Sequence, residues 1–351
     1  MSYIPKPKVS HPGLGKNKLG LTVRDYEGGL STLCAGCGHD SITAGIIQAC
    51  FELSIEPHKV GKMSGIGCSS KTPGYFLSSA HGFNSVHGRM PSVTTGANAA
   101  NKDITYLAVS GDGDTASIGI GQFAHVIRRK LNMLYIVENN GCYGLTKGQF
   151  SATADVGSKN KKGVPNEMDP IDPAAFALQM GAGFVARSFS GDKKQLIPLI
   201  KAGLNYKGFA MIDVISPCVT FNNHEGSTKS YEYVREHETE VNVLDFVPKR
   251  EEISVDYPKG QSTSVTLHDG SQMILKKLDQ NYDPEDRLEA LKQIQMHQKR
   301  NEVITGLLFL DPKERDMHDM IATPSKPLRD YSLSELCPGN EALQALNKSW
   351  R

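Results

Sequence analysis

The sequence has 351 residues, of which 39% are hydrophobic and 22% are charged, and its formal net charge is +1. This composition is that of an ordinary globular protein, and its near-neutral charge gives no indication of a nucleic-acid partner. No stretch approaches the roughly 18 apolar residues that a membrane helix needs, and the polar, Pro- and Gly-rich start lacks the apolar run of a secretory signal. We therefore expect a cytoplasmic protein without nucleic-acid or membrane partners.

The first hundred residues show few regular elements. Residues 1–30 read as an arm that needs a surface to be ordered. Apolar residues at helical spacing predict a helix from Asp40 to about Ser54, with Asp40 as its N-cap, and a short strand near 59–67. Residues 68–103 are rich in Gly, Ser and Thr and show little periodicity.

A strand–helix–strand pattern begins at residue 104. An apolar strand (104–110), a turn (111–114), a helix (117–130) and a second apolar strand (131–138) make a unit typical of parallel sheets. The pattern continues with a helix at 172–181, a strand at 183–189, a helix at 191–206 and a strand at 209–215. This alternation predicts an α/β fold with a doubly wound, mostly parallel sheet and ligands at the carboxyl ends of its strands.

The alternation ends near residue 225. Two strand-like halves of 263–278 flank an Asp269-Gly270 turn, 283–306 reads as a helix, and the last 40 residues are polar. We divide the chain into an arm (1–30), a ligand-binding domain (31–225) and a C-terminal extension (226–351) that contacts a partner. A disordered tail fits 311–351 equally well.

Two short polar motifs stand at the ends of neighbouring predicted strands. Gly111-Asp112-Gly113 ends one strand and Asn139-Asn140 ends the next, with 25 residues between Gly113 and Asn139. A helical crossover of this length brings the two strand ends side by side, so that Asp112 and Asn140 can share a Mg²⁺ ion that also binds phosphate oxygens. The glycines allow a diphosphate to approach the backbone, and the next helix points its N-terminus there. Either motif taken singly is explained as an ordinary turn, whereas the pair at this spacing resembles the thiamine diphosphate motif of thiamine-dependent enzymes.

The chain has seven cysteines, an odd number spread over a long sequence, which indicates reduced thiols and not a disulfide framework. Cys34 and Cys37 lie one turn apart, and with Cys68 and Cys218 they could supply four thiolates to a [4Fe–4S] cluster or to zinc. Neighbouring Gly and Ser residues suit a cluster. Buried core cysteines beside a redox-active CxxC pair explain the same spacing equally well.

Six motifs occur in the order expected for the β subunit of 2-oxoacid:ferredoxin oxidoreductases: LCAGCGHD, SGIGCSSKTPGYF, HGRMPSVTTGAN, GDGDTASIGIGQF, NNGCYGLTKGQFSAT and ISPC. The sequence resembles that family closely over 30–230 and loosely beyond. The resemblance implies the diphosphate-binding fold of thiamine-dependent enzymes. It also implies one [4Fe–4S] cluster on Cys34, Cys37, Cys68 and Cys218, and a further Mg²⁺ ligand in the backbone carbonyl of Cys142. It gives no role to Cys50 or Cys337.

The same resemblance marks residues around the cofactor. It implies catalytic roles for His39, Lys71 and Lys147, although a single His or Lys is otherwise explained as a core or surface residue. It implies that the thiamine cofactor is also contacted by Ser69, His87, Gly88, Arg89, Gly144 and Leu145. We expect Asp114 to cap the following helix, and Gly96–Asn98 to belong either to the floor of the site or to the scaffold.

The resemblance implies a reversible reaction in which a 2-oxoacid is oxidatively decarboxylated with coenzyme A, and electrons pass through the cluster to ferredoxin. A chain with one sheet domain has no room for the pyrimidine-binding domain of thiamine enzymes, so an α subunit should supply it. Lys147 lies in a loop that resembles the 2-oxoglutarate and broad-range members, and its cation could balance a distal carboxylate. Pyruvate is the alternative substrate. A non-redox thiamine decarboxylase and a zinc-stabilised binding subunit are alternatives from other classes.

Overall fold

The computed structural model describes residues 11–158, 162–221, 255–266, 272–278 and 282–350. The chain forms two compact units, Met1–Met317 and His318–Arg351. The expected turn at Asp269-Gly270 and the first ten residues of the expected arm lie outside the described residues.

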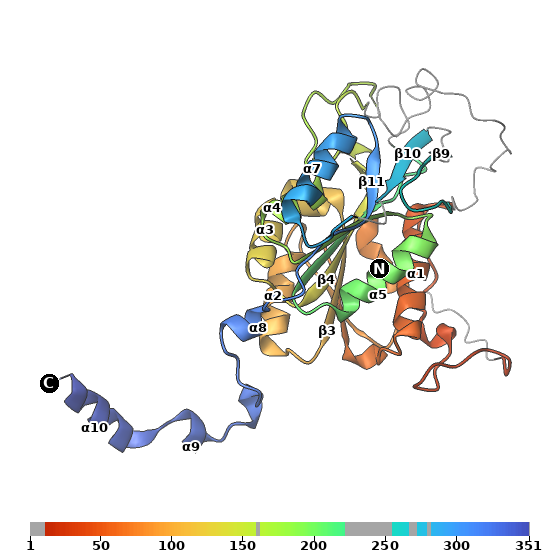
Figure 1. Cartoon of the computed structure of the whole chain (residues 1–351). Coiled ribbons are helices and arrows are strands. Elements are labelled where there is room, and N and C mark those ends of the chain that lie inside the picture. The colour runs from red at the N-terminus through yellow and green to blue at the C-terminus, as the bar shows by residue number, and fades with distance from the viewer. Residues whose placement is uncertain (1–10, 159–161, 222–254, 267–271, 279–281, 351) are drawn as a thin grey trace. The chain divides into compact units, whose positions relative to one another are not determined.

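A nine-stranded sheet organises the first unit (Figure 1). Its order is β2-β1-β3-β4-β8-β7-β11-β10-β9, and the strands from β2 to β7 in that order are all parallel. Their bounds are β1 Val60–Ser64, β2 His81–Asn84, β3 Thr105–Gly111, β4 Met133–Asn139, β7 Phe184–Phe189, β8 Phe209–Ile215, β9 Ser262–Thr266, β10 Gln272–Lys277 and β11 Val303–Leu310. The expected doubly wound, mostly parallel sheet is confirmed.

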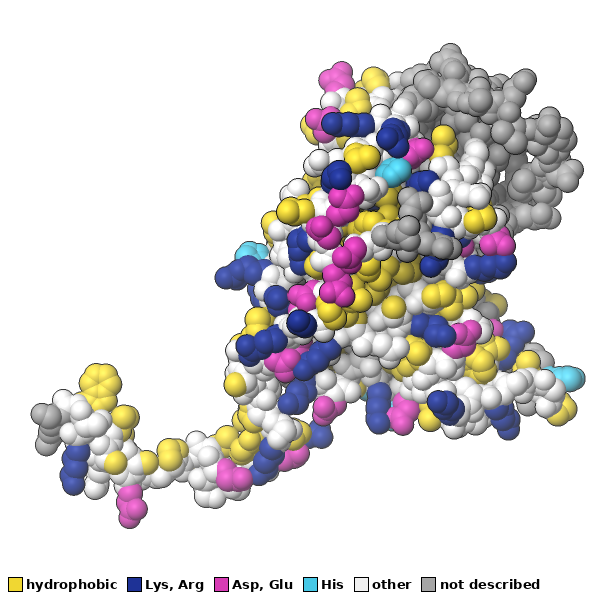
Figure 2. Space-filling model, in the orientation of Figure 1, with side chains coloured by type: hydrophobic (Ala, Val, Ile, Leu, Met, Phe, Trp, Pro, Cys, Tyr) yellow, Lys and Arg dark blue, Asp and Glu magenta, His cyan; other side chains and the backbone are white. Residues whose placement is uncertain are grey.

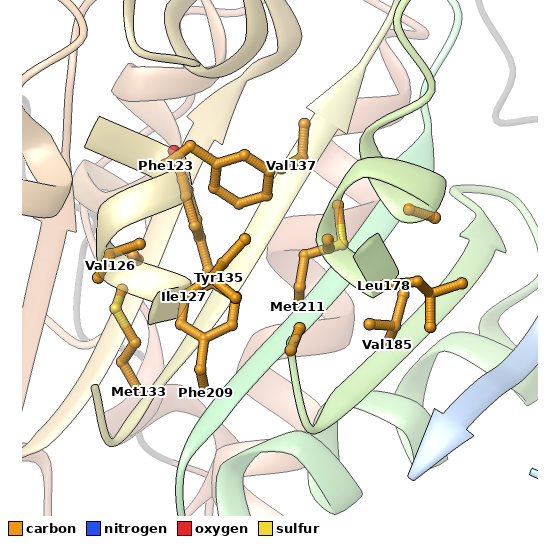
Figure 3. Packing of buried hydrophobic residues seen from close by; sticks show 14 of the residues in the cluster. Phe123, Val126, Ile127, Met133, Tyr135, Val137, Leu178, Val185, Phe209 and Met211 are labelled. Atoms are coloured by element: carbon orange, nitrogen blue, oxygen red, sulfur yellow. The ribbon is translucent and has the colours of Figure 1, made fainter. Parts of the chain in front are cut away.

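Helices cover both faces of this sheet (Figure 1). One face packs against α2 (Met90–Ala100), α3 (Ile120–Arg128), α4 (Pro173–Gln179) and α7 (Arg287–Gln298). The other packs against α1 (Gly38–Glu52) and α5 (Lys193–Asn205). Figure 3 shows the first of these cores, in which the Phe123 ring lies 5.3 Å from that of Tyr135 and 6.2 Å from that of Phe209. Alternate residues of the central strands therefore enter different cores.

Two local expectations were wrong, and one stretch without visible periodicity contains regular elements. The first helix begins at Gly38 with Cys37 as its N-cap, so Asp40 lies within the first turn. The stretch 68–103 contains β2 and α2, whose small and polar residues conceal the helical period. The helix expected over 283–306 ends at Gln298, because Asn301 adopts a left-handed φ of 57°, and the apolar run that follows forms β11.

Strand β11 joins the C-terminal region to the central sheet. It pairs antiparallel with β7 and parallel with β10, and β10 pairs antiparallel with β9 as the hairpin pattern predicted. The sheet of the ligand-binding domain is thus completed by residues far beyond 225.

The second unit contains α9 (Leu333–Leu336) and α10 (Gly339–Ser349) and follows the short α8 (Met317–Met320). Its helices expose apolar side chains, among them Leu333 (80%), Leu343 (54%) and Trp350 (85%). Figure 2 shows such side chains at the surface of this segment. Within the described ranges, the helices are too short or too polar for any of them to cross a bilayer.

Candidate functional site

Four neighbouring strands of the sheet end at one edge, and each is followed by residues that the sequence singled out. Strand β1 leads to Cys68, β3 to Asp112, β4 to Asn140 and β8 to Cys218. The backbone N–H of Asn140 donates to Oδ1 of Asp112 over 3.4 Å, and both side chains are buried. The expectation that these two residues meet above the sheet is confirmed.

The carboxylate of Asp112 is held on one side by two hydroxyl groups. Its Oδ2 accepts hydrogen bonds from Oγ of Ser151 at 2.5 Å and from Oγ1 of Thr153 at 2.6 Å. Hydroxyl donors of this kind hold a carboxylate in a fixed orientation, as a hard cation requires of its ligand. Ser151 and Thr153 were not predicted as site residues, because a Ser-x-Thr step in a polar loop carries no periodic or spacing signal.

The loop after β4 folds over the Gly111-Asp112-Gly113 turn. The hydroxyl of Tyr143 donates to the carbonyl of Gly113 at 3.0 Å. A Cβ atom on Gly113 would lie 2.5 Å from the Tyr143 ring, so only glycine fits there. The side-chain oxygen of Asn140 accepts the N–H of Cys142 at 3.0 Å, which fixes its amide beside Asp112.

Asp114 does not cap the following helix, and that expectation was wrong. The chain after Asp112 forms a π-helical turn, Gly113–Ile118, and Asp114 lies inside it. Its Oδ1 accepts the N–H of Gly88 at 2.7 Å and contacts Nδ1 of His87, while Oδ2 accepts the Ser110 hydroxyl at 2.5 Å. Asp114 thereby anchors the His87-Gly88 turn at the same edge as Asp112, and His87 also packs edge-on against Tyr143.

The four cysteines predicted as cluster ligands approach this edge from three segments. A Cβ atom on Gly144 would lie 3.5 Å from Sγ of Cys68 and 3.6 Å from Sγ of Cys218, so both sulfurs face the loop after β4. Sγ of Cys34 accepts the Thr220 hydroxyl at 3.7 Å, two residues from Cys218. Cys37 is the N-cap of α1, and the first residue of that helix, Gly38, packs against Ser216.

Burial raises the pKa of the Cys37 and Cys68 thiols, and the proximity of Cys218 adds to both shifts. Among the described residues, no three or more His, Cys, Asp or Glu side chains are placed to hold a single metal ion. The four sulfurs therefore do not converge on one point. A cluster of four irons and four sulfides spaces its ligands more widely than one ion does.

Cys218 differs from the other thiols in its surroundings. A hydrogen bond from Cys142 lowers the pKa of Cys218 to about 7, and the backbone N–H groups of Thr220 and Phe221 assist against the effect of burial. The Phe221 N–H lies 3.4 Å from its sulfur, and the Phe221 carbonyl lies 3.8 Å from Sγ of Cys142. The thiol of Cys142, for which no role was expected, supports this sulfur in the thiolate form that metal ligands need.

A buried polar network lies beneath the cysteines on the α1 face of the sheet. Nδ1 of His39 lies 2.7 Å from Oγ of Ser216, and its Nε2 lies 3.2 Å from Oγ of Ser69. Glu138 lies 3.6 Å from the same imidazole and accepts a hydrogen bond from Thr72 at 3.0 Å. Burial lowers the pKa of His39 to about 4 and raises the pKa of Glu138 well above its ordinary value, so His39 is neutral near pH 7. Its catalytic role stays a prediction.

The remaining predicted residues lie at the exposed rim. Nζ of Lys71 donates to the Thr32 carbonyl at 3.3 Å, and its charge reaches the neighbouring Cys68. Lys147 adopts a left-handed φ of 79° in the turn closed by its N–H to the carbonyl of Gly144, at 3.1 Å. Leu145 is 52% exposed, and Arg89 is exposed at the start of α2.

Of the two roles expected for Gly96–Asn98, floor of the site or scaffold, the structure favours the scaffold. The Asn98 amide contacts the carbonyl of Asn132 at 3.4 Å, just before the amino end of β4. A cavity of about 280 Å³ also opens at that amino edge, lined by residues such as Lys102 and Tyr106. Ligands of doubly wound sheets bind at the carboxyl edge, where the residues above converge, so we take that edge as the candidate site.

Comparisons with known proteins agree with this geometry. The family described as "Thiamine pyrophosphate enzyme, C-terminal TPP binding domain" matches residues 60–214. Over 199 residues the chain is 43% identical to a 2-oxoacid:ferredoxin oxidoreductase subunit beta of Saccharolobus solfataricus, which covers 56% of this chain and 65% of that protein. Over 190 residues it is 38% identical to a 2-oxoglutarate synthase subunit KorB of Methanocaldococcus jannaschii, covering 54% of this chain and 69% of that one.

A solved structure is also similar. It is a 2-oxoglutarate:ferredoxin oxidoreductase from Magnetococcus marinus with 2-oxoglutarate, coenzyme A and succinyl-CoA bound. The TM-score is 0.71 at 26% identity, over 96% of this chain and 99% of that one. Among the curated relatives, the matched segment spans 65%, 63% and 60% of three archaeal β subunits, which is less than two thirds of their lengths.

Proposed function

Because this chain belongs to the family of 2-oxoacid:ferredoxin oxidoreductase β subunits, we propose that it is the thiamine diphosphate- and iron–sulfur-binding subunit of such an enzyme. With an α subunit it would decarboxylate a 2-oxoacid oxidatively to acyl-CoA and CO₂ and pass the electrons to ferredoxin. The observation that carries the proposal is that the loop after β4 reaches both Asp112 and two of the cysteines. It begins with Asn140, beside Asp112, and four residues later Gly144 packs on the sulfurs of Cys68 and Cys218. One short loop thus joins a diphosphate–metal edge to a cluster edge.

Mg²⁺ would be held by the carboxylate of Asp112, the amide oxygen of Asn140 and the backbone carbonyl of Cys142. Oxygen donors of these three kinds suit Mg²⁺, which keeps its other positions for phosphate oxygens and water. The fit is supported by the two hydroxyls that orient Asp112 and by the backbone bond that orients Asn140. The diphosphate would lie against Gly111, Gly113 and the N-terminal turn of the following helix, where backbone N–H groups favour an anion.

A [4Fe–4S] cluster would be held by Cys34, Cys37, Cys68 and Cys218. Their fit is supported by the shared proximity of Cys68 and Cys218 to Gly144 and by the N–H of Phe221 directed at Cys218. The neutral His39 and its two serine partners lie between α1 and the strand ends, so that His39 adds no positive charge beside the cluster.

Thiamine diphosphate, when bound, supplies the carbanion chemistry that breaks the bond to the carboxylate. This chain positions and shields that chemistry. Tyr143 covers the Gly113 turn, and Asp114 holds His87, Gly88 and the start of α2 at the same edge. His87, Ser69 and Leu145 would then line the cofactor, with Arg89 at the mouth as an anion-binding group.

We favour 2-oxoglutarate as the substrate, with pyruvate or a broad range of 2-oxoacids as the alternative. Lys147 and Lys71 are cations at the exposed rim, and a second carboxylate on the substrate would pair with such a group. Lys147 keeps an unfavourable left-handed backbone that glycine would adopt without strain, which is typical of a side chain retained for function.

The partners we propose are an α subunit that completes the cofactor site, ferredoxin, coenzyme A and the 2-oxoacid. The exposed apolar side chains of α9 and α10 support a contact with another subunit. The free thiols favour a reducing compartment, and we place the enzyme in the cytoplasm.

The test is an anaerobic purification of the chain with its partner, followed by an absorption spectrum, iron and zinc analysis, and turnover with 2-oxoglutarate or pyruvate. We expect a brown protein with absorption near 400 nm that bleaches on reduction, and dye reduction that depends on coenzyme A. Release of CO₂ without dye reduction would favour a non-redox decarboxylase. One zinc per chain and no iron would favour a structural site, and either result would reject the proposal.

A further inference from the structure

At the carboxyl end of β4, the side chains of the consecutive residues Glu138 and Asn139 point to opposite faces of the sheet. Glu138 follows the period of Leu134 and Ile136, which pack against α1 and α5, and it lies beside His39 of α1. Asn139 follows the period of Tyr135 and Val137, which pack against α3 and α4. The side chain of Asn139 therefore lies on the other face, beneath Asp112 and Asn140.

Asn139 continues a row of polar side chains that crosses three adjacent strands on that face. The Asn139 amide donates to Oδ1 of Asp213 at 3.1 Å, and Nε of Arg187 donates to Oδ2 of the same carboxylate at 2.7 Å. Arg187 and Asp213 are direct neighbours in the parallel register of β7 and β8. The three side chains belong to β4, β8 and β7, which are adjacent in the sheet.

The row is buried and its charges are compensated. Asn139, Asp213 and Arg187 are 4%, 0% and 5% exposed. The other side of the guanidinium reaches Asp172, which caps α4 and accepts Nη2 of Arg187 at 2.5 Å. Replacing such groups by packed apolar residues is often neutral or stabilising, so burial of this row needs a reason other than stability.

The upper end of the row meets the proposed Mg²⁺ ligands twice. Thr153 Oγ1, which bonds to Asp112 at 2.6 Å, also lies 3.0 Å from Oδ1 of Asn139. Asn139 is in addition the residue directly before Asn140, and its carbonyl accepts the N–H of Ser216 at 2.8 Å. Asp213 thus holds the side chain of Asn139 in place. Asn139 in turn reaches Asp112 through Thr153 and Asn140 through the peptide bond between them.

We propose that Asn139, Asp213 and Arg187 form a positioning row that sets the geometry of the Mg²⁺ ligands Asp112 and Asn140 without touching the metal. The inference rests on the proposed function, because the metal site belongs to it. Outer partners of this kind typically change metal affinity 10- to 100-fold when they are altered. In this proposal Asn140 binds the metal, and Asn139 positions the ligands without binding it.

The test measures metal binding directly, with Mn²⁺ as the probe. The full chain with its partner is titrated with Mn²⁺ in the presence of thiamine diphosphate, and free Mn²⁺ is followed by electron paramagnetic resonance. Asp213→Asn leaves a single acceptor for two donors, the Asn139 amide and the Arg187 guanidinium, and should weaken Mn²⁺ binding about 10-fold or more. Arg187→Lys keeps the cation but cannot span Asp213 and Asp172, and should weaken it in the same sense.

Glu314→Gln is the matched control. It makes the same carboxylate-to-amide change at a buried side chain that pairs with Lys130 at 3.2 Å and lies beside Gly183 and Gly208, at the amino ends of β7 and β8. It should lower the melting temperature without changing the Kd for Mn²⁺. Wild-type Kd values in both row variants, or an equal loss in the control, would overturn the positioning row. Failure of the wild-type complex to bind Mn²⁺ with thiamine diphosphate would instead reject the proposed function.

Discussion

Gly38 sets how closely the cysteine-bearing end of α1 approaches the sheet. A Cβ atom at this position would lie 2.5 Å from Oγ of Ser190, 2.6 Å from Oγ of Ser216 and 3.0 Å from Cβ of Ser190. Contacts between such atoms are normally about 3.5 Å or longer, so Gly38→Ala requires a movement of roughly 1 Å. Rotation of the two hydroxyls cannot relieve all of it, because the Ser190 Cβ contact stays and Ser216 is bonded to His39 at 2.7 Å.

The expected cost of Gly38→Ala follows from this crowding. Overpacking a close contact costs about 1–3 kcal/mol, and a loss of that size lowers the melting temperature by a few degrees. A shift of Gly38 also moves the residue before it, Cys37. We therefore expect a larger effect on the cluster than on the fold. Iron content and absorption near 400 nm should fall by half or more in an anaerobic preparation with its partner subunit.

Gly45→Ala, in the same helix, is the control for this experiment. A Cβ atom there would meet Ile200, Leu196 and Ile197 at 3.6 to 3.8 Å, which are ordinary contacts. Replacing a helical glycine should then stabilise the protein by up to about 1 kcal/mol and leave its iron content unchanged. Full iron content in Gly38→Ala, together with a melting temperature at or above that of the wild type, would refute the close-approach reasoning.

Three further outcomes are expected. Asp112→Ala should abolish binding of thiamine diphosphate with Mg²⁺ in calorimetry while circular dichroism stays native; unchanged affinity would contradict the ligand assignment. Cys68→Ala should lose iron and ferredoxin or dye reduction but keep thiamine diphosphate binding, and full dye reduction without iron would show that electrons leave by another route. Lys147→Gly should relieve about 1 kcal/mol of backbone strain and raise the melting temperature slightly. It should also raise the KM for 2-oxoglutarate more than that for pyruvate, and an equal change for both acids would remove Lys147 from substrate recognition.

The alternation of apolar runs was sufficient to predict the central strands. Four of them, β3, β4, β7 and β8, lie within two residues of the ranges expected from the sequence, because a strand buried on both faces reads as a continuous apolar run. The pairing of Asp112 with Asn140 followed from the same pattern. A parallel crossover returns each strand end to the same edge, so spacing along the chain specifies proximity in space.

Other features carried no such signal. Helix α2 has small and polar residues in place of an apolar stripe, and β11 extends the sheet through a pairing with β7 more than a hundred residues away. No local property of residues 303–310 specifies that neighbour, because strand partners are chosen by tertiary packing.

The local environment of each polar residue was likewise decided by the tertiary structure. Asp114 has the residue type and the position in sequence of a helix cap. It instead anchors the His87 turn, because the fold brings that turn against it from another part of the chain. The sequence supplied the residues that could bind Mg²⁺ and thiolate-held iron. Which hydroxyl orients Asp112, and which face of the sheet each of Glu138 and Asn139 serves, depends on side-chain contacts between residues up to 74 positions apart in sequence, such as Asn139 and Asp213. Hydrogen bonds act over about 3 Å in space, so a sequence pattern records them only where the chain separation is itself regular.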